Sequence, residues 1–314
     1  MKAYTLPAPG GPDRLTLREL STYPLGSDNV LLRTRAIALN PINLKTSHGK
    51  GLYEQLRHDD PLILGWDVAG EIAELGSPDL PYSVGDRLFG MVNFPGQGSA
   101  YAEYVTVPVG QVVRIPDGVS YEDAAATCLA ALTAWQNIVQ LGKVQSGQRV
   151  LIHAAGGGVG HFAVQLAKER GAYVIATSSG KKRDFVLGLG ADEHIDYKKK
   201  RFEEEIEPVD IVLDSRDADH LERSLQVVKP GGHLFTIGAQ ISDELKQRAD
   251  ARGVAVTRHL VHSDGEQMQA LADRLADGRL KAHVSQTYPF DRLPEALREL
   301  ERGHAEGKIV VRVS

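Results

Sequence analysis

Apolar positions along the chain follow two different patterns, and the change between them lies near residue 118. Up to that point the chain contains short apolar or alternating runs, separated by turns that contain glycine and proline. The clearest of these runs are 29–39, 67–76, 86–92 and 102–107. Such runs, bounded by turn residues, are typical of strands. The first 118 residues therefore predict a β-rich domain with few helices.

Beyond residue 118 the pattern becomes one of strands that alternate with helices. Ser120 is suited to cap a helix, and the alanine- and leucine-rich run after it predicts a helix over 120–141. The expected strands are 149–155, 172–178, 193–197, 210–215, 233–239 and 254–261, and the expected helices are 159–170, 182–189 and 219–228. Because short apolar strands between such helices are typical of a parallel sheet covered on both faces, this part predicts an α/β, doubly wound Rossmann domain.

The last part of the chain returns to the first domain in this prediction. It contains an expected helix over 264–277, a strand near 282–288, a helix over 293–302 and the terminal strand KIVVRV. A chain of 314 residues is long enough for about two domains. We therefore expect a β-rich domain of 1–118 and 262–314, interrupted by a Rossmann domain of 119–261.

Residues 150–160, VLIHAAGGGVG, join an apolar strand to an amphipathic helix through a run of glycines. The dinucleotide fingerprint requires a strand before the glycines and a helix after them. In the frame Ala155-x-Gly157-x-x-Gly160, the first position starts a tight turn, the second lets the backbone approach a pyrophosphate, and the third allows close packing of helix and strand. The expected cofactor contacts here are Ala155, Gly157, Gly158, Val159 and Gly160. A purely structural turn is the alternative.

The end of the next expected strand distinguishes between the two nicotinamide cofactors. A site for NAD usually places an acidic residue there, which binds the ribose 2′-hydroxyl. This chain instead has Ser178, Ser179, Lys182 and Arg183 in that region, and residues 176–183 contain no carboxylate. Serine hydroxyls can donate to a 2′-phosphate and lysine can neutralise it. We therefore expect NADPH, with an exposed basic loop that only caps a helix as the alternative.

Composition and charge exclude several other classes of protein. The net charge of −5 gives no reason to expect binding to nucleic acid. No run of about 18 apolar residues suggests a membrane span, and the N-terminus does not resemble a signal peptide. Cys128 is the single cysteine, which excludes a disulfide framework and fits a reducing compartment. We expect a cytoplasmic protein that binds neither nucleic acid nor membranes.

Several segments, taken in order, resemble the zinc-independent quinone oxidoreductases, the zeta-crystallin-like group of the medium-chain dehydrogenase/reductase superfamily. They are NPINLK (40–45), GWDVAGEI (65–72), VGDRLFG (84–90), LTAW (132–135), HAAGGGVGHFAVQLAK (153–168), LGAD (189–192) and GHAEGKIVVRV (303–313). The resemblance covers essentially the whole chain. It implies that the β-rich part is a GroES-like catalytic domain beside the Rossmann domain.

The chain departs from the zinc-using members of that superfamily, and the departure predicts a site without metal. Those enzymes carry a cysteine in the first loop, a Gly-His-Glu segment and a lobe with four cysteines. This chain has Lys45 and its neighbours in the first loop, Gly65-Trp66-Asp67 at the second position, and no cysteine cluster. Zinc requires three or four nitrogen, sulfur or carboxylate ligands. We therefore expect no metal.

The resemblance also implies which residues act on the substrate. Asn40 and Lys45 would lie in a loop that faces the nicotinamide, and Tyr53 would line the substrate pocket. Asn43 stands where the family more often has aspartate. A turn at the end of a strand with an exposed lysine, and a surface tyrosine, are the structural alternatives for these three residues.

Four further residues are assigned to the cofactor by the same resemblance. Thr133 would lie beside the nicotinamide carboxamide, and Tyr197 against the adenosine phosphate. Gly238 would permit close approach to the nicotinamide ribose. Lys308 would either reach the cofactor or lie on the surface. His153, in the middle of a strand, is expected to be a buried, hydrogen-bonded residue rather than a catalyst.

These observations together predict an NADPH-dependent oxidoreductase that transfers hydride to a quinone or an α,β-unsaturated carbonyl without zinc. Position, exclusion of water and hydrogen-bond donors would supply the catalysis. One alternative is an NADPH-binding structural or regulatory protein with little turnover, and another is an enoyl-thioester reductase. The family resemblance suggests a homodimer.

Overall fold

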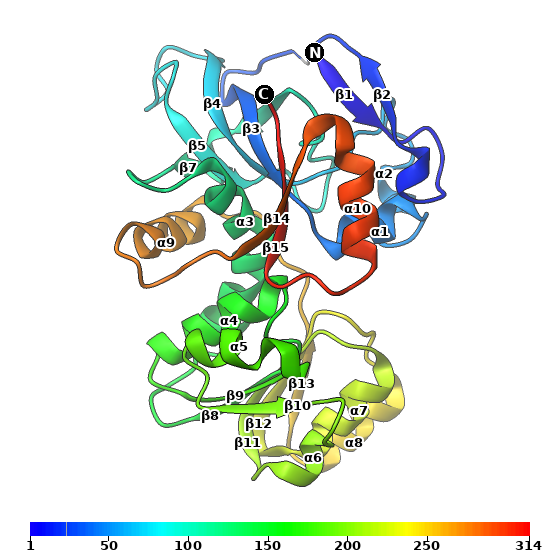
Figure 1. Cartoon of the computed structure of the whole chain (residues 1–314), viewed down its shortest axis with the longest axis vertical. Helices are drawn as coiled ribbons and strands as arrows, with labels where there is room; N and C mark the ends of the chain where they lie inside the picture. Colours follow the sequence, from blue (N-terminus) through cyan, green and yellow to red (C-terminus); the bar gives the residue numbers. More distant parts are fainter. Residues whose placement is uncertain (23) are drawn as a thin grey trace. The chain divides into compact units, whose positions relative to one another are not determined.

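The computed structural model describes residues 1–22 and 24–314, which form two compact units (Figure 1). Unit 1 contains Met1–Leu132 and His262–Ser314, and unit 2 contains Thr133–Val261. The first boundary lies within helix α3 (Tyr121–Trp135), whereas the sequence pattern placed the change at residue 118. The physical reason is that the buried carboxylate of Asp67 accepts the N–H of Leu129 and ties this helix to unit 1.

Unit 1 is built on a mixed sheet whose strands follow the order β14-β15-β3-β4-β5-β7, with β6 also paired to β3. These strands are β3 (Asn29–Ala38), β4 (Asp67–Leu75), β5 (Arg87–Met91), β6 (Tyr104–Pro108), β7 (Val113–Arg114), β14 (Val284–Pro289) and β15 (Lys308–Arg312). An antiparallel hairpin of β1 (Lys2–Thr5) and β2 (Thr16–Glu19) lies outside this sheet. The C-terminal strand therefore lies beside β3 and completes the unit that the N-terminal part begins.

The helices of unit 1 include one that the sequence pattern treated as a loop. They are α1 (Pro41–Ser47), α2 (Tyr53–Leu56), α3, α9 (Gly265–Ala276) and α10 (Leu293–Glu301). The expected loop at 40–45 is in fact the start of α1. Pro41 occupies the first helical position, where its missing N–H costs nothing. The side chain of Asn43 accepts the N–H of Asn40, which fixes the helix start.

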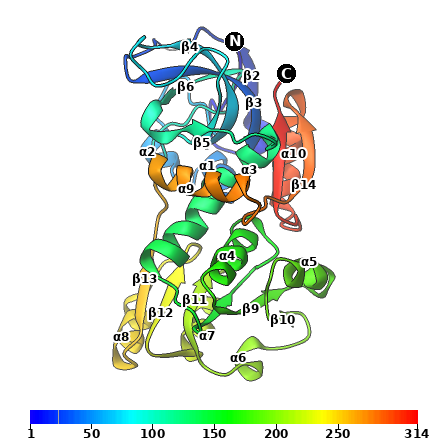
Figure 2. The same cartoon turned by 90° about the vertical axis from the view of Figure 1, so that its left-hand side faces the viewer.

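Unit 2 is a doubly wound parallel sheet with the strand order β10-β9-β8-β11-β12-β13. The strands are β8 (Arg149–Ile152), β9 (Tyr173–Ser178), β10 (Glu193–Asp196), β11 (Val209–Asp214), β12 (Val228–Thr236) and β13 (Ala255–Arg258), and the helices are α4 (Gly158–Glu169), α5 (Arg183–Gly188), α6 (Phe202–Glu205), α7 (Ala218–Gln226) and α8 (Asp243–Ala251). Helices α4 and α5 cover one face and α7 and α8 the other (Figures 1 and 2). The strand order reverses between β8 and β11, which is where such sheets bind ligands.

The helix that leads into unit 2, and α8 within that unit, differ from the expected elements. The predicted helix over 120–141 is α-helical only to Trp135 and continues as a π-helix, η3 (Gln136–Leu141). Helix α8 was not predicted, because only Leu245 and Ala249 of its residues are buried and the rest of its sequence is polar. Ser242 caps this helix by accepting the N–H of Leu245. A two-residue apolar stripe is too short to show helical periodicity.

Apolar cores hold the sheets in place. In unit 2 the buried cluster includes Leu151, Ile175, Val212 and Leu234, which come from neighbouring parallel strands. Such strands are buried on both faces, which explains their continuous apolar sequences. Within the described part of the chain, no helix is both long enough and apolar enough to span a membrane.

Candidate functional site in the nucleotide-binding unit and at helix α1

The glycine-rich segment forms a tight turn between β8 and α4. Ala154 has a φ of 50°, a left-handed conformation that is unusual for a residue other than glycine. The N–H of Ala155 donates to the carbonyl of Thr177, and the N–H of Gly157 donates to the carbonyl of Ala154. The strained position of the turn is therefore Ala154, which the glycine frame did not single out.

Helix α4 begins directly at this turn, and its first residues pack closely against the turn backbone. Gly157 is the residue before the helix, and Gly158 and Val159 open its first turn. A Cβ on Gly157 would meet only the carbonyl oxygen of Ala154, at 3.2 Å. A Cβ on Gly160 would lie 2.3 Å from that same oxygen and would clash. The backbone amides at the start of a helix attract anions, and those of α4 follow this turn directly.

His161 lies in the first turn of α4 but is directed back into the protein. It is fully buried, and its Nδ1 lies 3.0 Å from the carbonyl oxygen of Gly157. Because a carbonyl only accepts, this nitrogen carries the proton and donates it. The imidazole therefore binds the turn itself.

The basic segment after β9 lies against the same turn. Lys182 Nζ donates to the carbonyl of Gly156 at 3.2 Å, and the lysine side chain fills the space beside that glycine. Ser178 is buried and hydrogen-bonded to the imidazole of His194, whereas Ser179 precedes the short helix η4 (Gly180–Lys182). The tertiary structure thus brings Lys182 to the turn between β8 and α4, whereas the hydroxyl of Ser178 is bound to His194 and to the carbonyl of Ser179.

A carboxylate that sequence reasoning missed also lies in this region. Asp196 ends β10, and its register partner in β9 is Ser178. Its Oδ2 lies 2.6 Å from where a Cβ on Gly180 would be. Residues 176–183, at the end of β9 and after it, contain no acid, whereas this carboxylate comes from the neighbouring strand. The site therefore contains one acid beside its lysine and serines.

A cavity of about 250 Å³ lies at the carboxyl ends of β8, β9, β10 and β11. Tyr197, predicted to contact the adenosine part of the cofactor, is half exposed and lines it. The other lining residues are Ala154, Thr177, Phe202, Arg216, Asp217, Asp219, His220 and Arg223. The cavity adjoins the strand-order reversal, the expected place for a nucleotide in this class of sheet.

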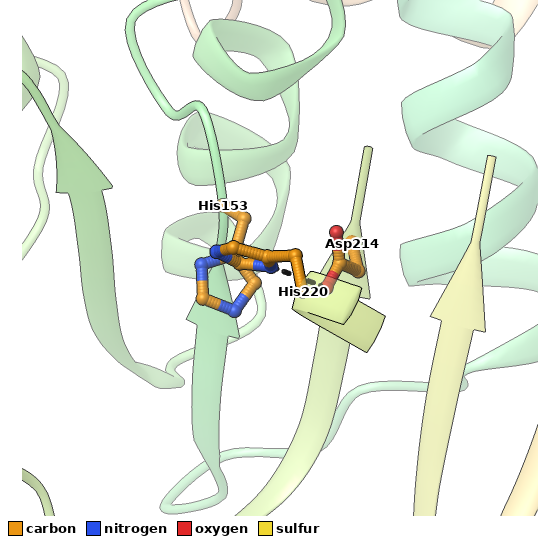
Figure 3. Close-up of side chains that lie close together, drawn as sticks. All are labelled: His153, Asp214 and His220. Atoms are coloured by element: carbon orange, nitrogen blue, oxygen red, sulfur yellow. Dashed lines mark hydrogen bonds and ion pairs between the residues drawn. The ribbon is translucent and has the colours of Figure 1, made fainter. Parts of the chain in front are cut away.

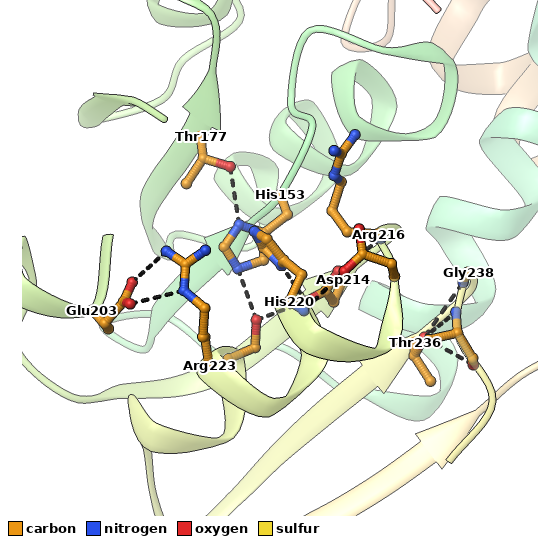
Figure 4. Close-up of polar contacts among 12 residues, drawn as sticks. His153, Thr177, Glu203, Asp214, Arg216, His220, Arg223, Thr236 and Gly238 are labelled. Atoms are coloured by element: carbon orange, nitrogen blue, oxygen red, sulfur yellow. Dashed lines mark hydrogen bonds and ion pairs between the residues drawn. The ribbon is translucent and has the colours of Figure 1, made fainter. Parts of the chain in front are cut away.

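A chain of hydrogen bonds supports the floor of this cavity (Figures 3 and 4). Asp214 Oδ2 accepts from Ser224 at 2.6 Å and from Nδ1 of His220 at 2.8 Å. Because the Ser224 proton goes to Asp214, its oxygen must accept from Nε2 of His153, 3.1 Å away. Nδ1 of His153 then accepts from the Thr177 hydroxyl at 2.9 Å. The prediction of a buried, hydrogen-bonded His153 is confirmed.

Burial and hydrogen bonding fix the charges in this network. Burial lowers the pKa of His153 to about 3, although Asp214 opposes the shift. Burial alone would raise the pKa of Asp214, but the hydrogen bonds from His220 and Ser224 and the nearby imidazoles bring it to about 2. The network at neutral pH therefore holds a neutral His153 and a charged Asp214.

The same three residues form a group whose ligand atoms all lie within 4.8 Å of one another: His153, Asp214 and His220 (Figure 3). Their spacing alone would allow a metal ion. However, both nitrogens of His153 already have hydroxyl partners, and Asp214 already accepts from three groups. The polar atoms are satisfied by the protein, which is the ordinary state of buried polar groups.

The side wall of the cavity is held by a paired arginine. Arg223 donates from Nε and from one terminal nitrogen to the two carboxylate oxygens of Glu203, at 2.8 and 2.7 Å (Figure 4). Its guanidinium also lies over the ring of Phe202, 4.8 Å from the centroid. The hydrogen bond from Arg223 lowers the pKa of Glu203 to about 2. Helix α6 is thereby attached to α7.

Two other predicted cofactor residues lie in unit 2, and one of them, Gly238, has a steric reason for its identity. A Cβ on Gly238 would lie 2.4 Å from the carbonyl oxygen of Arg216, so the loop after β12 could not pack against the loop after β11. Figure 4 shows the N–H of Gly238 directed at the hydroxyl of Thr236. Thr133 is buried and its carbonyl accepts from Asn137.

In unit 1, Asn40 is held at both ends of its side-chain amide. Its Nδ2 donates to Asp67 Oδ2 at 2.8 Å, and its Oδ1 accepts from Lys308 Nζ at 2.5 Å. The side chain is only 2% exposed. Asn40 therefore serves the start of α1, and its side-chain amide is already committed within the protein.

Lys308 is buried, so the surface position that was one of its two expected places is wrong. It is 3% exposed, and its ammonium donates to the carbonyl of Leu39 and to Asn40, both in unit 1. The reason is that β15 pairs with β3 and brings the first residue of β15 beside the end of that strand.

Lys45 and Tyr53 are the accessible members of the predicted catalytic set. Lys45 lies in the last turn of α1 with an exposed side chain, and Tyr53 begins α2 with a partly exposed ring. The backbone connects them, because Lys50 donates to the carbonyl of Lys45 and Tyr53 donates to the carbonyl of Lys50. The position of α1 thus determines where both side chains lie.

Comparison with protein families assigns the two parts of the chain. Residues 26–117 match the alcohol dehydrogenase GroES-like domain, and residues 189–311 match the zinc-binding dehydrogenase model. The chain is 32% identical over 321 residues to the 2-methylene-furan-3-one reductase of Solanum lycopersicum, a match that covers 99% of this chain and 79% of that protein.

Solved structures agree with this assignment. The quinone oxidoreductase of Coxiella burnetii superposes with a TM-score of 0.94 at 32% identity, over 100% of this chain and 99% of that one. The Escherichia coli quinone oxidoreductase in complex with NADPH superposes with a TM-score of 0.89 at 26% identity, over 99% of this chain and 100% of that one. The expected fold, a Rossmann unit with a GroES-like unit, is confirmed.

Proposed function

Because the chain belongs to the quinone oxidoreductase group of the medium-chain dehydrogenase/reductase superfamily, we propose that it is an NADPH-dependent enzyme that reduces quinones or α,β-unsaturated carbonyls. The turn between β8 and α4 carries this proposal. It offers the backbone amides of a helix start directly after Gly157, next to a cavity at the strand-order reversal. Names of similar proteins supply the class of acceptor, a quinone or an enone.

The residues of unit 2 fit a dinucleotide. The first amides of α4 and the residues Ala155 to Gly160 would hold the pyrophosphate, and Tyr197 would border the adenosine part. When bound, the nicotinamide supplies the hydride. Thr133 would lie beside the nicotinamide carboxamide, and Gly238 would permit close approach to the nicotinamide ribose.

NADPH rather than NADH is supported by the groups beside the turn. Lys182, Ser179 and Arg183 offer a cation and donors for a 2′-phosphate, and Asp196 opposes them with one negative charge. Lys182→Glu is expected to weaken NADPH binding about tenfold or more and to leave NADH binding nearly unchanged. Fluorescence titration with both cofactors measures this, with Lys143→Glu as the matched surface control. An unchanged preference would show that Lys182 does not bind the phosphate.

In unit 1, Lys45 and Tyr53 are the proposed substrate contacts. An exposed ammonium can donate to the oxygen of a quinone or an enone, where negative charge develops as hydride arrives. Tyr53 would supply an apolar ring and a hydroxyl at the pocket wall. Asn40 would act through α1, because both ends of its amide are occupied.

The proposed reaction needs no zinc. The single cysteine is buried, and the position of the Gly-His-Glu segment is taken by a buried aspartate bound to Asn40 and Leu129. A metal analysis of the purified protein is expected to find far less than one zinc per chain. A content of one zinc per chain would overturn the proposal that the reaction needs no zinc.

A direct assay tests the proposed function. Oxidation of NADPH is followed with 9,10-phenanthrenequinone, 1,4-benzoquinone and a short enone, and each reaction is repeated with NADH. Turnover of at least one acceptor with NADPH, and weaker turnover with NADH, is expected. Tight NADPH binding without turnover of any acceptor would support a structural or regulatory protein instead. Turnover confined to enoyl thioesters would identify an enoyl-thioester reductase.

We also propose a cytoplasmic homodimer. Among the described strands, β13 pairs only with β12, so its other edge offers backbone donors and acceptors to a second copy. Light scattering is expected to give twice the mass of one chain. A monomer over the whole concentration range would remove this proposal.

A further inference from the structure

A buried ion pair lies at the start of α1 and has no part in the proposed chemistry. Lys308 Nζ and Asp67 Oδ2 are 3.7 Å apart, and their side chains are 2% and 0% exposed. Lys308 is the first residue of β15 and Asp67 is the first residue of β4. The two charges come from opposite parts of the sequence and meet inside unit 1.

The pair binds the amide of Asn40 in one orientation only. The Asp67 carboxylate accepts from Nδ2, and the Lys308 ammonium donates to Oδ1. If the amide were turned over, its NH₂ group would face the ammonium and its oxygen would face the carboxylate. Both contacts would then be repulsive. The ion pair therefore determines how Asn40 is placed.

Each charge is also tied to a second element. The Lys308 ammonium donates to the carbonyl of Leu39 at 2.8 Å, at the end of β3. Asp67 Oδ1 accepts the N–H of Leu129 at 2.9 Å, within α3. The pair thus connects β3, β4, β15 and α3 at the residue where α1 begins.

Burial makes the two charges depend on each other. Burial raises the pKa of Asp67 and lowers the pKa of Lys308, and the attraction between the charges opposes both shifts. The carboxylate oxygens of Asp67 serve only as acceptors, as an ionised carboxylate does. Removing one partner of such a pair leaves an uncompensated buried charge, which is strongly destabilising.

Helix α1 needs this support because it is short. It has 7 residues, and a helix of that length is not stable by itself in water. Its start is Asn40, and its last turn carries Lys45. A shift of the helix start therefore moves Lys45.

We propose that Lys308 and Asp67 are positioning residues: an internal ion pair that orients Asn40, fixes the start of α1 and thereby places Lys45. Lys308 is then a structural counter-ion rather than a cofactor ligand. Only the kinetic consequence of this inference rests on the proposed function.

The first test measures whether the two charges are coupled. Lys308→Met and Asp67→Asn alone are each expected to lower the melting temperature by roughly 10 °C. The double variant, which removes both charges, is expected to lose clearly less than the sum of the single variants. Lys246→Met removes an exposed Lys–Asp pair on α8 and is the matched control, with little expected change. Additive losses would overturn the ion-pair part of the proposal.

The second test asks whether the pair positions α1. In the double variant, hydrogen exchange of residues 41–47 is expected to rise about tenfold, with α9 of unit 1, which contains no partner of the pair, unchanged. The Kd of NADPH is expected to stay within about twofold of wild type, whereas kcat with the best acceptor falls about tenfold. Unchanged exchange in α1 would overturn the positioning role, and a tenfold weaker binding of NADPH would restore Lys308 as a cofactor ligand.

The two proposals can fail separately. If the wild-type protein binds NADPH but reduces no acceptor, the proposed function is wrong, and melting and hydrogen exchange still decide the role of the pair. If the wild type is active and the double variant keeps full kcat, the proposed function stands and the pair does not place Lys45.

Discussion

Gly160 has no room for a side chain, because the carbonyl of Ala154 lies where a Cβ would be. The sequence predicted this close packing from the glycine frame, since the spacing of the fingerprint encodes the contact between helix and strand. It did not indicate Ala154, whose positive φ is a property of the folded turn. Residue spacing reports contacts that recur in a motif, whereas backbone strain depends on the particular structure.

We expect Gly160→Ala to lower the free energy of unfolding by about 1–3 kcal/mol, because the added methyl group must displace backbone atoms. The same change is expected to weaken NADPH binding, since it moves the start of α4. Urea unfolding and a cofactor titration measure the two effects. Gly188→Ala is the control, because a Cβ there meets nothing within 4 Å. Equal stability of the two variants would contradict the steric argument.

His153 makes stability depend on pH. Below pH 6.5 the unfolded chain takes up a proton at this residue, whereas the folded chain, with a pKa of about 3, does not. The free energy of unfolding therefore falls as pH drops from about 6.5 toward 3, by about 1.4 kcal/mol per pH unit in the middle of that range. Asp214, with a pKa of about 2, adds a loss below about pH 4.

Urea unfolding at pH 7, 6 and 5 measures this slope. His153→Asn is expected to be less stable at pH 7 and to lose less stability on acidification, because it no longer offers a protonation site to the unfolded chain. If the His153→Asn variant lost stability with falling pH as steeply as the wild type, His153 would not be the residue responsible for this pH dependence.

At the scale of elements, α1 shows where sequence patterns fail. NPINLK contains proline and two asparagines, which are typical turn residues, and a loop was expected there. In the structure Pro41 and Asn43 start a helix, since proline suits the first helical position and Asn43 satisfies the N–H of Asn40. The same residue types serve turns and helix starts, and only the packing around them decides between the two.

We expect Asn43→Ala to cost about 1–3 kcal/mol of stability, because the N–H of Asn40 would lose its acceptor in a buried place. Asn43→Asp keeps an acceptor and removes the buried Nδ2 donor that has no partner, so it is expected to cost less. Urea unfolding compares the two variants. An equal loss in both would show that the hydrogen bond from Asn40 does not stabilise α1.

Strands and helices of unit 2 were predicted with more success, for a physical reason. Its strands are buried on both faces, and this leaves continuous apolar runs in the sequence. Helix α8 was not predicted, because its buried stripe consists of only two residues. The more apolar surface an element buries, the more clearly its periodicity shows in the sequence.

At the scale of the whole molecule, the cofactor is expected to stabilise unit 2 selectively. A ligand at one hundred times its Kd adds about 2.7 kcal/mol to the stability of the part that binds it. Hydrogen exchange with saturating NADPH is therefore expected to slow in β8, α4 and β9, with a smaller effect in β4 and β5. Protection confined to unit 1 would place the nucleotide elsewhere.

The amino-acid sequence by itself determined the two kinds of sheet, the glycine-rich turn between β8 and α4, and the family, because these depend on local patterns and on motif spacing. Tertiary structure alone decided the rest. It placed Lys308 inside unit 1 beside Asp67, and it brought Asp196 next to the basic loop. Contacts of this kind join residues that are far apart in the sequence and become neighbours through the order of the strands. The sequence pattern around a charged residue does not indicate which partner that residue will meet.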